Sequence, residues 1–199
     1  MNFLAHQYLS GDNHGLRIGN FIGDFVKGNK WQDYPIAIQQ GILLHRSIDN
    51  FTDNHPIVRE SIKILRPKMA RYSGIANDIF FDHFLAKQWG TFSNFDLKNF
   101  SEETYQIINN SIVLLPERTA YVLQYMQQQN WLYNYQFISG IEKTMNGMSR
   151  RTQQIAFENS HNILLENYEE IKNCFDEFFP LLELHVAIFI LNLKSTQDV

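Results

Sequence analysis

The 199-residue sequence contains little cysteine, proline or glycine, with one Cys, five Pro and ten Gly. The single cysteine, Cys174, cannot form an internal disulfide or a cysteine-ligated zinc site, so any metal site must use histidine and carboxylate ligands. This cysteine usage indicates a reducing compartment, the cytoplasm. With 44% hydrophobic residues, the composition excludes collagen-like and disordered chains and allows one sizeable core.

The sequence also lacks an excess of positive charge and a long apolar run. Its 17 Lys+Arg and 21 Asp+Glu give a formal net charge of -4, which argues against a generally basic nucleic-acid binder. The first 15 residues carry no positive charge before a short apolar stretch, so we expect no signal peptide. The most apolar C-terminal run, Val186 to Leu191, is far shorter than the roughly 20 residues of a membrane span. We therefore expect no membrane or nucleic-acid partner.

Apolar residues recur at helical spacing along nearly the whole chain, whereas the alternation typical of strands is hard to find. We therefore predict an all-α, single-domain multi-helix bundle over residues 1–199. Residues 1–90 should carry the chemistry, and residues 91–199 should form covering and C-terminal helices. The expected helices are 2–9, 15–26, 34–50, 57–65, 75–89, 96–114, 116–130, 135–145, 152–173 and 175–193.

Histidine and aspartate are concentrated in the first 83 residues, which favours a functional site there. Aspartate is a poor helix-interior residue because its short side chain competes for backbone hydrogen bonds. Aspartates inside apolar helical patterns therefore need a reason other than helix formation. Three such patterns place two polar residues four apart, on one helix face: Asn20/Asp24, His45/Asp49 and Asp78/Asp82.

These three pairs offer the oxygen and imidazole ligands that Mn²⁺, Fe²⁺, Zn²⁺ or Mg²⁺ requires. Buried carboxylates without a cation would be destabilising or protonated, and positive side chains near the pairs are few. Gly19 and Gly23 would let another helix or a ligand approach the first pair closely. The sequence predicts that a single divalent ion is held by Asp24, His45, Asp78 and Asp82. Alternative or supporting ligands are His6, Asn20, Asp49, Asp53, His55 and His83.

Each feature taken alone also has a plainer explanation. A single His45/Asp49 pair is more often a salt bridge or an imidazole-orienting bond than a metal site. Asp53 followed by His55 could form a helix cap and a turn. A histidine near the N-terminus, such as His6, is more often structural than a ligand. The coincidence of three pairs is what favours a metal centre.

Basic residues cluster between positions 59 and 71, where Glu60 is the single acidic residue. They form what we term the basic strip: Arg59, Lys63, Arg66, Lys68 and Arg71. Arg59, Lys63 and Arg66 are spaced four and three apart, so they share a helix face. The strip is either a solvated charged face or a docking surface for an acidic macromolecule or phosphate.

Four segments together resemble the acyl carrier protein phosphodiesterase family, also called acyl carrier protein hydrolase: 1–6, 19–28, 44–56 and 78–86. This family is distantly similar to HD-type metal-dependent phosphohydrolases, which are all-helical and use His and Asp ligands. The familiar His-Asp order is reversed here, at Asp82 and His83. The resemblance implies an HD-phosphohydrolase-like fold. It also implies hydrolysis of the 4'-phosphopantetheine phosphodiester of holo-acyl carrier protein, Mn²⁺ as the usual activator, and a role in fatty acid biosynthesis.

The expected enzyme is thus a metal-dependent phosphodiesterase whose substrate is an acidic helical carrier protein. Arg46 or Lys27 could neutralise the charge that develops on the phosphoryl group. The expected catalytic residues are Asp24, His45, Arg46, Asp49, Asp82 and His83. The alternatives are an HD-like phosphohydrolase acting on a small nucleotide or other phosphoester, a non-catalytic helical metal-binding protein, and a di-iron bundle. A di-iron bundle usually requires Glu and Glu-x-x-His pairs, whereas these clusters are rich in Asp.

Overall fold

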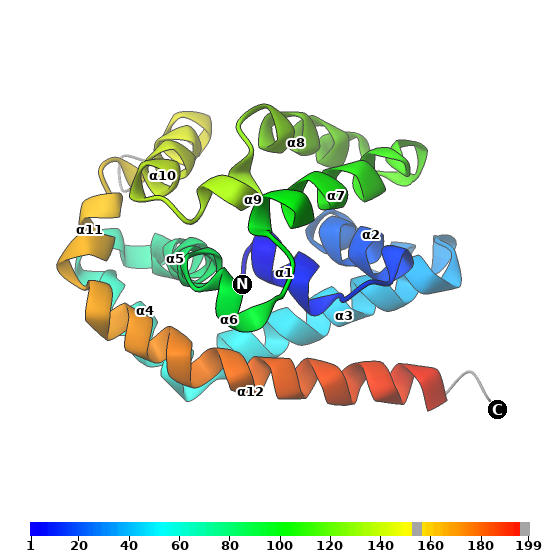
Figure 1. The fold of residues 1–199 in the computed structure, drawn as a ribbon, viewed down its shortest axis with the longest axis horizontal. Coiled ribbons are helices and arrows are strands. Elements are labelled where there is room, and N and C mark those ends of the chain that lie inside the picture. Colours follow the sequence, from blue (N-terminus) through cyan, green and yellow to red (C-terminus); the bar gives the residue numbers. More distant parts are fainter. Residues whose placement is uncertain (153–156, 196–199) are drawn as a thin grey trace.

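The structure is a computed structural model that describes residues 1–152 and 157–195, and this part of the chain contains helices but no strand (Figure 1). The all-α prediction is therefore confirmed. The α-helices are α1 Phe3–Leu9, α2 His14–Ile22, α3 Ile36–Asn54, α4 Pro56–Met69, α5 Ser73–Lys87, α6 Trp89–Phe92, α7 Leu97–Asn109, α8 Glu117–Gln128, α9 Trp131–Asn134, α10 Ile138–Thr152, α11 His161–Glu166 and α12 Tyr168–Ser195. Short 3₁₀ helices are η1 Gly23–Phe25, η2 Lys30–Asp33, η3 Ala70–Tyr72 and η4 Ile112–Leu114.

Local sequence signals explain several helix starts. The Asn13 side chain accepts a hydrogen bond from Leu16 N at the start of α2, and Asp96 caps α7 by accepting from two backbone N–H groups. Pro56 occupies the first position of α4, where its missing N–H leaves no hydrogen bond unmade. In the described ranges, no helix has both the length and the hydropathy needed to span a membrane.

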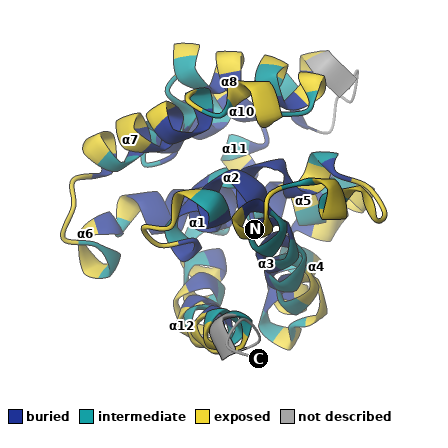
Figure 2. Cartoon of the chain, turned by 90° about the vertical axis from the view of Figure 1, so that its right-hand side faces the viewer, coloured by how far each residue is buried: buried dark blue, intermediate teal, exposed yellow. Residues whose placement is uncertain are grey.

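The helices lie in three layers, which Figure 2 shows edge-on. The outer layers contain α7, α8 and α10 on one side and α3, α4 and α12 on the other, with α1, α2 and α5 between them. The long α12 packs across α3, α4 and α5. The middle layer is largely buried, and α1 in particular has fully buried Leu4 and Ala5. Polar side chains on α1 are therefore held in a fixed environment.

Helices α2 and α3 approach one another at backbone distance because glycines face each other at their crossing. A Cβ added at Gly19 would lie 2.1 Å from Ile38 O and 2.7 Å from Gly41 Cα. A Cβ at Gly41 would lie 2.4 Å from Leu16 O. This contact brings Asn20 of α2 next to His45 of α3.

The C-terminal helix boundaries differ from the expected ones. The break expected near Cys174 is wrong, because α12 runs through it with Ile171, Phe175, Phe178 and Leu182 fully buried on one face. Within the described residues the helix expected over 152–173 is interrupted at 157–160 and again at Asn167, whose side chain donates to Ile163 O at 2.8 Å and so competes with the next helical turn. Part of the helix expected over 152–173 lies outside the described residues, at 153–156.

The Gly19 contact can be tested by Gly19→Ala, which we expect to lower the free energy of unfolding by about 1–3 kcal/mol through overpacking. Urea denaturation would measure this change. The matched control is Gly74→Ala in α5, where an added Cβ meets nothing within 4 Å. This control should be neutral or stabilising by up to about 1 kcal/mol. Equal stability of the two variants would show that α2 and α3 are not tightly apposed.

Candidate metal centre

Two histidines and an aspartate, from α1 and α3, form a compact cluster. His6 Nε2 lies 3.2 Å from Asp49 Oδ1, and His45 Nε2 lies 3.0 Å from Asp49 Oδ2. The two imidazole rings stack with their centroids 4.3 Å apart. One ligand atom from each residue lies within 4.8 Å of the other two. Since metal–ligand bonds are about 2.0–2.6 Å long, the three side chains could hold one metal ion.

Asn20 fixes the orientation of both imidazoles. Its Oδ1 lies 2.6 Å from His6 Nδ1 and 3.2 Å from His45 Nδ1. Its Nδ2 donates to His6 O and to Ser10 Oγ, each at 2.9 Å. These two bonds fix the amide so that its oxygen faces the rings. Because an amide oxygen only accepts, the network assigns a proton to Nδ1 of each histidine. When the imidazoles are neutral, their Nε2 lone pairs are then directed at the Asp49 side of the cluster.

The two Nε2 atoms are buried and, among the residues described, have no partner in hydrogen-bonding geometry, although Asp49 is at ion-pair distance. Buried polar atoms are normally hydrogen-bonded, and leaving one unsatisfied costs about 1–3 kcal/mol. A divalent cation between His6, His45 and Asp49 would satisfy both lone pairs and neutralise the carboxylate. The residues present therefore fit a metal ion, and two imidazoles with one carboxylate suit borderline ions such as Mn²⁺, Fe²⁺ or Zn²⁺.

Asp24 lies at the solvent side of this cluster, on η1 directly after α2. Its Oδ1 is 3.4 Å from His45 Nε2, and 67% of its side chain is exposed. A Cβ at Gly23 would lie 2.2 Å from His45 Cγ, so only glycine allows η1 to pass this close to the ring. Asp24 is thus positioned to act as a further ligand or as a base in contact with solvent.

Burial and neighbouring charges shift the pKa values of the cluster in opposite directions. Burial lowers the pKa of His6, and the adjacent His45 lowers it further. Burial also acts to lower the pKa of His45, but Asp24 and Asp49 outweigh it and raise this pKa to about 9. Burial opposes ionisation of Asp49, yet the two histidines hold its pKa well below the usual range. Without a metal, the cluster therefore pairs a protonated His45 with a carboxylate.

Asp78 and Asp82 are on α5, and their carboxylates contact the N-terminus of the chain and the start of α1. Asp82 is fully buried and accepts hydrogen bonds from Leu4 N at 2.8 Å and Ala5 N at 3.1 Å. Asp78 Oδ1 forms an ion pair with the Met1 amine at 3.0 Å. Burial raises the pKa of Asp82 to about 7, against the lowering effect of the two backbone N–H groups. In this structure both carboxylates hold α1, which carries His6, and do not belong to the His6, His45 and Asp49 cluster.

The other expected residues on α3 and α5 make structural contacts. His83 Nδ1 lies 2.7 Å from the carbonyl oxygen of Tyr135, and its Nε2 lies 3.0 Å from Tyr168 Oη, so it joins α5 to the C-terminal half. Asp53 lies one turn beyond Asp49 and is largely exposed. Partial burial of its carboxyl raises its pKa. His55 lies between α3 and α4 and packs against Phe51 and Phe178.

Arg46 and the basic strip are also partly engaged. The Arg46 guanidinium donates to Val26 O at 3.1 Å and Gly28 O at 3.0 Å, so it holds the loop that carries Lys27. In the strip, Lys63 pairs with Glu60 at 2.6 Å, and Lys68 pairs with Glu166. Arg59 donates to Asn54, and Arg71 donates to Tyr72 while lying over its ring.

A cleft of about 530 Å³ opens beside the cluster. Asp24 connects the cleft with the cluster, since it lines the cleft and lies next to His45. Basic, acidic and aromatic side chains from distant parts of the chain line the rest, including Lys27, Asp78, Arg118, Trp131 and Tyr135. A substrate bound in the cleft would therefore contact Asp24, which lies 3.4 Å from His45 Nε2.

The sequence predicts His6 as an alternative ligand, and the structure places it beside His45 and Asp49. Ser10 and Arg118 are not among the residues that the sequence singles out. Ser10 is four residues after His6 on the same face of α1, a spacing that could have signalled its role in holding Asn20. Arg118 has no such signal, because only the tertiary fold brings α8 to the cleft.

The fold and the cluster define a class: all-helical proteins with a histidine–aspartate cluster that could hold a metal ion. The chain belongs to the acyl carrier protein phosphodiesterase family, whose model matches residues 1–182. The resemblance noted from the sequence is thus confirmed, and the metal-ligand set stays a prediction.

Curated relatives named acyl carrier protein phosphodiesterase support the same membership. The protein of Klebsiella pneumoniae (strain 342) is 36% identical over 182 residues, covering 90% of this chain and 94% of its own length. That of Enterobacter sp. (strain 638) is 34% identical over the same length and coverage. That of Escherichia coli O6:H1 is 34% identical over 186 residues. No solved structure matches the chain, so the HD-like fold stays a prediction.

Asn20→Ala should leave both Nδ1–H groups without their acceptor and lower the affinity for Mn²⁺ by about 10–100-fold. Asn20→Asp keeps the accepting oxygen, so its loss should be smaller. Isothermal titration of metal-free protein would measure both affinities. The control Asn50→Ala changes an exposed amide on α3 and should bind Mn²⁺ as the unmodified protein does. Unchanged affinity in Asn20→Ala would contradict the role of Asn20.

Proposed function

We propose that this protein is a metal-dependent phosphodiesterase that removes 4'-phosphopantetheine from holo-acyl carrier protein. Water would attack phosphorus and the bond from phosphorus to the serine oxygen would break. The products are free 4'-phosphopantetheine and the apo-protein with its serine hydroxyl restored. The observation that carries the proposal is the convergence of two imidazole Nε2 atoms on one carboxylate, next to Asp24, which lines an open cleft. Family membership supports the substrate.

His6, His45 and Asp49 would hold the ion, with Asp24 as a ligand from the solvent side. This proposal keeps Asp24 and His45 from the sequence-based set and replaces Asp78 and Asp82. When bound, a divalent ion supplies Lewis acidity that polarises a phosphoryl oxygen and lowers the pKa of water. We propose Mn²⁺ as the ion, because the ligand set suits it and the family resemblance implies Mn²⁺ as the usual activator.

The side chains around the ligands have separate roles. Asn20 holds both imidazoles in the orientation that ligation requires. In the metal-free cluster the contact with His45 lowers the pKa of Asp24, so Asp24 is ionised there, and its exposure would allow it to accept the proton of the attacking water. Lys27 lines the cleft and can stabilise the negative charge that develops on the phosphoryl group. Arg46 positions the Lys27 loop and is a positioning residue.

The direct test is to incubate the purified protein with holo-acyl carrier protein and measure the mass of the product. We expect loss of the phosphopantetheinyl group, no loss in excess chelator, and recovery with Mn²⁺ better than with Ca²⁺, which prefers more oxygen ligands. Full turnover after verified removal of metal would contradict metal dependence. Hydrolysis of small nucleotides without any action on the carrier protein would favour the small-substrate alternative.

Two sets of variants separate the proposed ligands from the residues that hold α1. His6→Ala and Asp49→Ala should lose bound metal and reduce kcat/KM by at least about 100-fold. Asp82→Asn should still bind one metal ion per chain but melt at a lower temperature, because an amide leaves one of the Leu4 and Ala5 N–H groups without an acceptor. Metal analysis with thermal melting distinguishes them. Loss of metal from folded Asp82→Asn would reinstate the sequence-based ligand set.

Metal affinity should rise with pH, because the ion must displace the proton that Asp24 and Asp49 hold on His45. The pKa of His45 is about 9 in the metal-free cluster, so apparent affinity should rise about tenfold per pH unit from 7 towards 9 and then level off. Titration with Mn²⁺ under argon at pH 7, 8 and 9 would measure this slope. A flat profile would show that no proton is displaced.

A further inference from the structure

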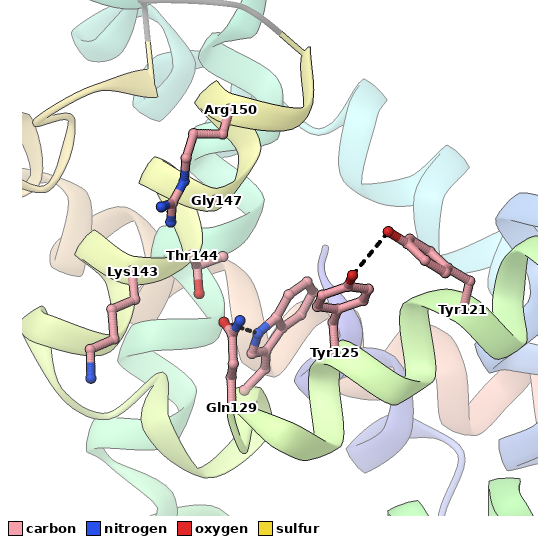
Figure 3. A pocket seen from close by; sticks show the side chains of 8 residues that line it. Tyr121, Tyr125, Gln129, Lys143, Thr144, Gly147 and Arg150 are labelled. Atoms are coloured by element: carbon pink, nitrogen blue, oxygen red, sulfur yellow. Dashed lines mark hydrogen bonds between the residues drawn. The ribbon is translucent and has the colours of Figure 1, made fainter.

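A second pocket, of about 220 Å³, lies between α8 and α10 and adjoins the cleft. Figure 3 shows Tyr121 and Tyr125 on α8 across the pocket from Thr144, Gly147 and Arg150 on α10, with the Lys143 side chain extending away from them. Trp131 and Thr144 line both this pocket and the cleft that reaches Asp24. The two hollows therefore form one continuous surface leading away from the His6, His45 and Asp49 cluster.

Four basic side chains border this surface, and we term them the rim cations: Lys27, Arg118, Lys143 and Arg150. All four are exposed, and none forms an ion pair with any residue that the structure describes. Lys143 and Arg150 lie two turns apart on one face of α10. Gly147 lies between them, and a Cβ there would meet nothing within 4 Å, so the space between the two cations is open.

The two carboxylates that line this surface form no ion pair with the rim cations. Asp24 is engaged with His45, and Asp78 with the Met1 amine. The protein as a whole has a net charge of -4, so a continuous surface bordered by unpaired cations is a local departure from its overall charge. Such a surface attracts an acidic partner and orients it on approach.

Exposed apolar side chains lie beside the rim cations. Tyr121 is 56% exposed and, with the 49% exposed Ile112, lines a hollow that adjoins the pocket. Val113, in the same 3₁₀ turn as Ile112, is 89% exposed. Aromatic and aliphatic side chains flanked by arginine are typical of the centre of a protein–protein interface, where they are shielded from water in the complex.

The basic strip on α4 and η3 differs from the rim cations, because part of its charge is already paired. Two of its members pair with glutamates, Lys63 with Glu60 and Lys68 with Glu166. An acidic partner would have to displace these glutamates before it could pair with Lys63 or Lys68. An exposed pair contributes little to stability, but its acidic member also cancels the positive field that would attract a partner.

We propose that the acidic carrier protein docks on the surface bordered by the rim cations and not on the basic strip. Carboxylates of the carrier protein would pair with Lys143 and Arg150, and one of its apolar side chains would enter the pocket between α8 and α10. Its modified serine would then face the cleft that leads to Asp24. This inference rests on the proposed function, because it takes the substrate to be a carrier protein.

The experiment compares two charge reversals of equal size, Lys143→Glu with Arg150→Glu, and Lys63→Glu with Lys68→Glu. Binding of apo-carrier protein, which cannot be turned over, is measured by fluorescence anisotropy at low and high salt. We expect the α10 double variant to weaken binding by about 10-fold or more at low salt, with a smaller effect at high salt because exposed charges are screened. The α4 double variant should change the Kd less than about twofold.

Turnover of holo-carrier protein supplies an independent readout. The α10 variant should raise KM while kcat changes less than about twofold, since docking precedes chemistry. Thermal melting checks that each variant is folded, and the neutral pair Lys143→Gln with Arg150→Gln should show an intermediate loss of affinity. A misfolded reversal variant is replaced by this neutral pair in every comparison.

Weaker binding in the α4 variant alone, or in neither variant, would overturn the docking proposal. An equal loss of affinity for free 4'-phosphopantetheine in the α10 variant would also overturn it, by showing that the pocket holds the small group and not the protein. If the unmodified protein binds the carrier protein through α10 but never cleaves it, the docking inference stands and the proposed function fails. If it cleaves the carrier protein and the α10 variant binds normally, the proposed function stands alone.

Discussion

The side-chain amide of Asn20 is the interaction on which the candidate site depends. Its oxygen faces both imidazoles while its nitrogen is fixed by His6 O and Ser10 Oγ, so one buried group sets two ring orientations at once. This arrangement is possible because the backbones of α2 and α3 touch at Gly19 and Gly41, which leaves Asn20 and His45 on facing surfaces. The close crossing of α2 and α3 thus lets Asn20 orient both imidazoles so that their Nε2 atoms are directed at the Asp49 carboxylate.

A second constraint keeps α1 in place. The buried Asp82 carboxylate accepts from the first backbone N–H groups of α1, where a helix has unpaired donors and a partial positive charge. The hydrogen bonds to Leu4 and Ala5 offset part of the free energy that burial of this carboxylate requires. They also fix the position of His6, one residue further along. Asp82 therefore acts on the site through α1, which explains an aspartate inside an otherwise apolar helix without making it a ligand.

The helical class could be predicted from sequence, because it follows from local spacing. The four-residue separation of His45 and Asp49 correctly places them on one face of α3. The same spacing in Asp78 and Asp82 could not show that these carboxylates meet the start of α1. The hydrogen bonds from Leu4 N and Ala5 N to Asp82 join residues that are 78 and 77 positions apart in the sequence. Likewise, the apolar residues on one face of α12 are present in the sequence. The residue at which this helix begins depends on the hydrogen bond from the Asn167 side chain to Ile163 O.

The central claim is that His6, His45 and Asp49 hold one divalent ion. Diffraction from crystals grown with Mn²⁺, recorded at a wavelength where manganese scatters anomalously, tests it most directly. We expect one anomalous peak about 2.0–2.6 Å from His6 Nε2, His45 Nε2 and an Asp49 oxygen. A peak coordinated by Asp78 and Asp82, or full manganese loading with no peak near the two histidines, would contradict it.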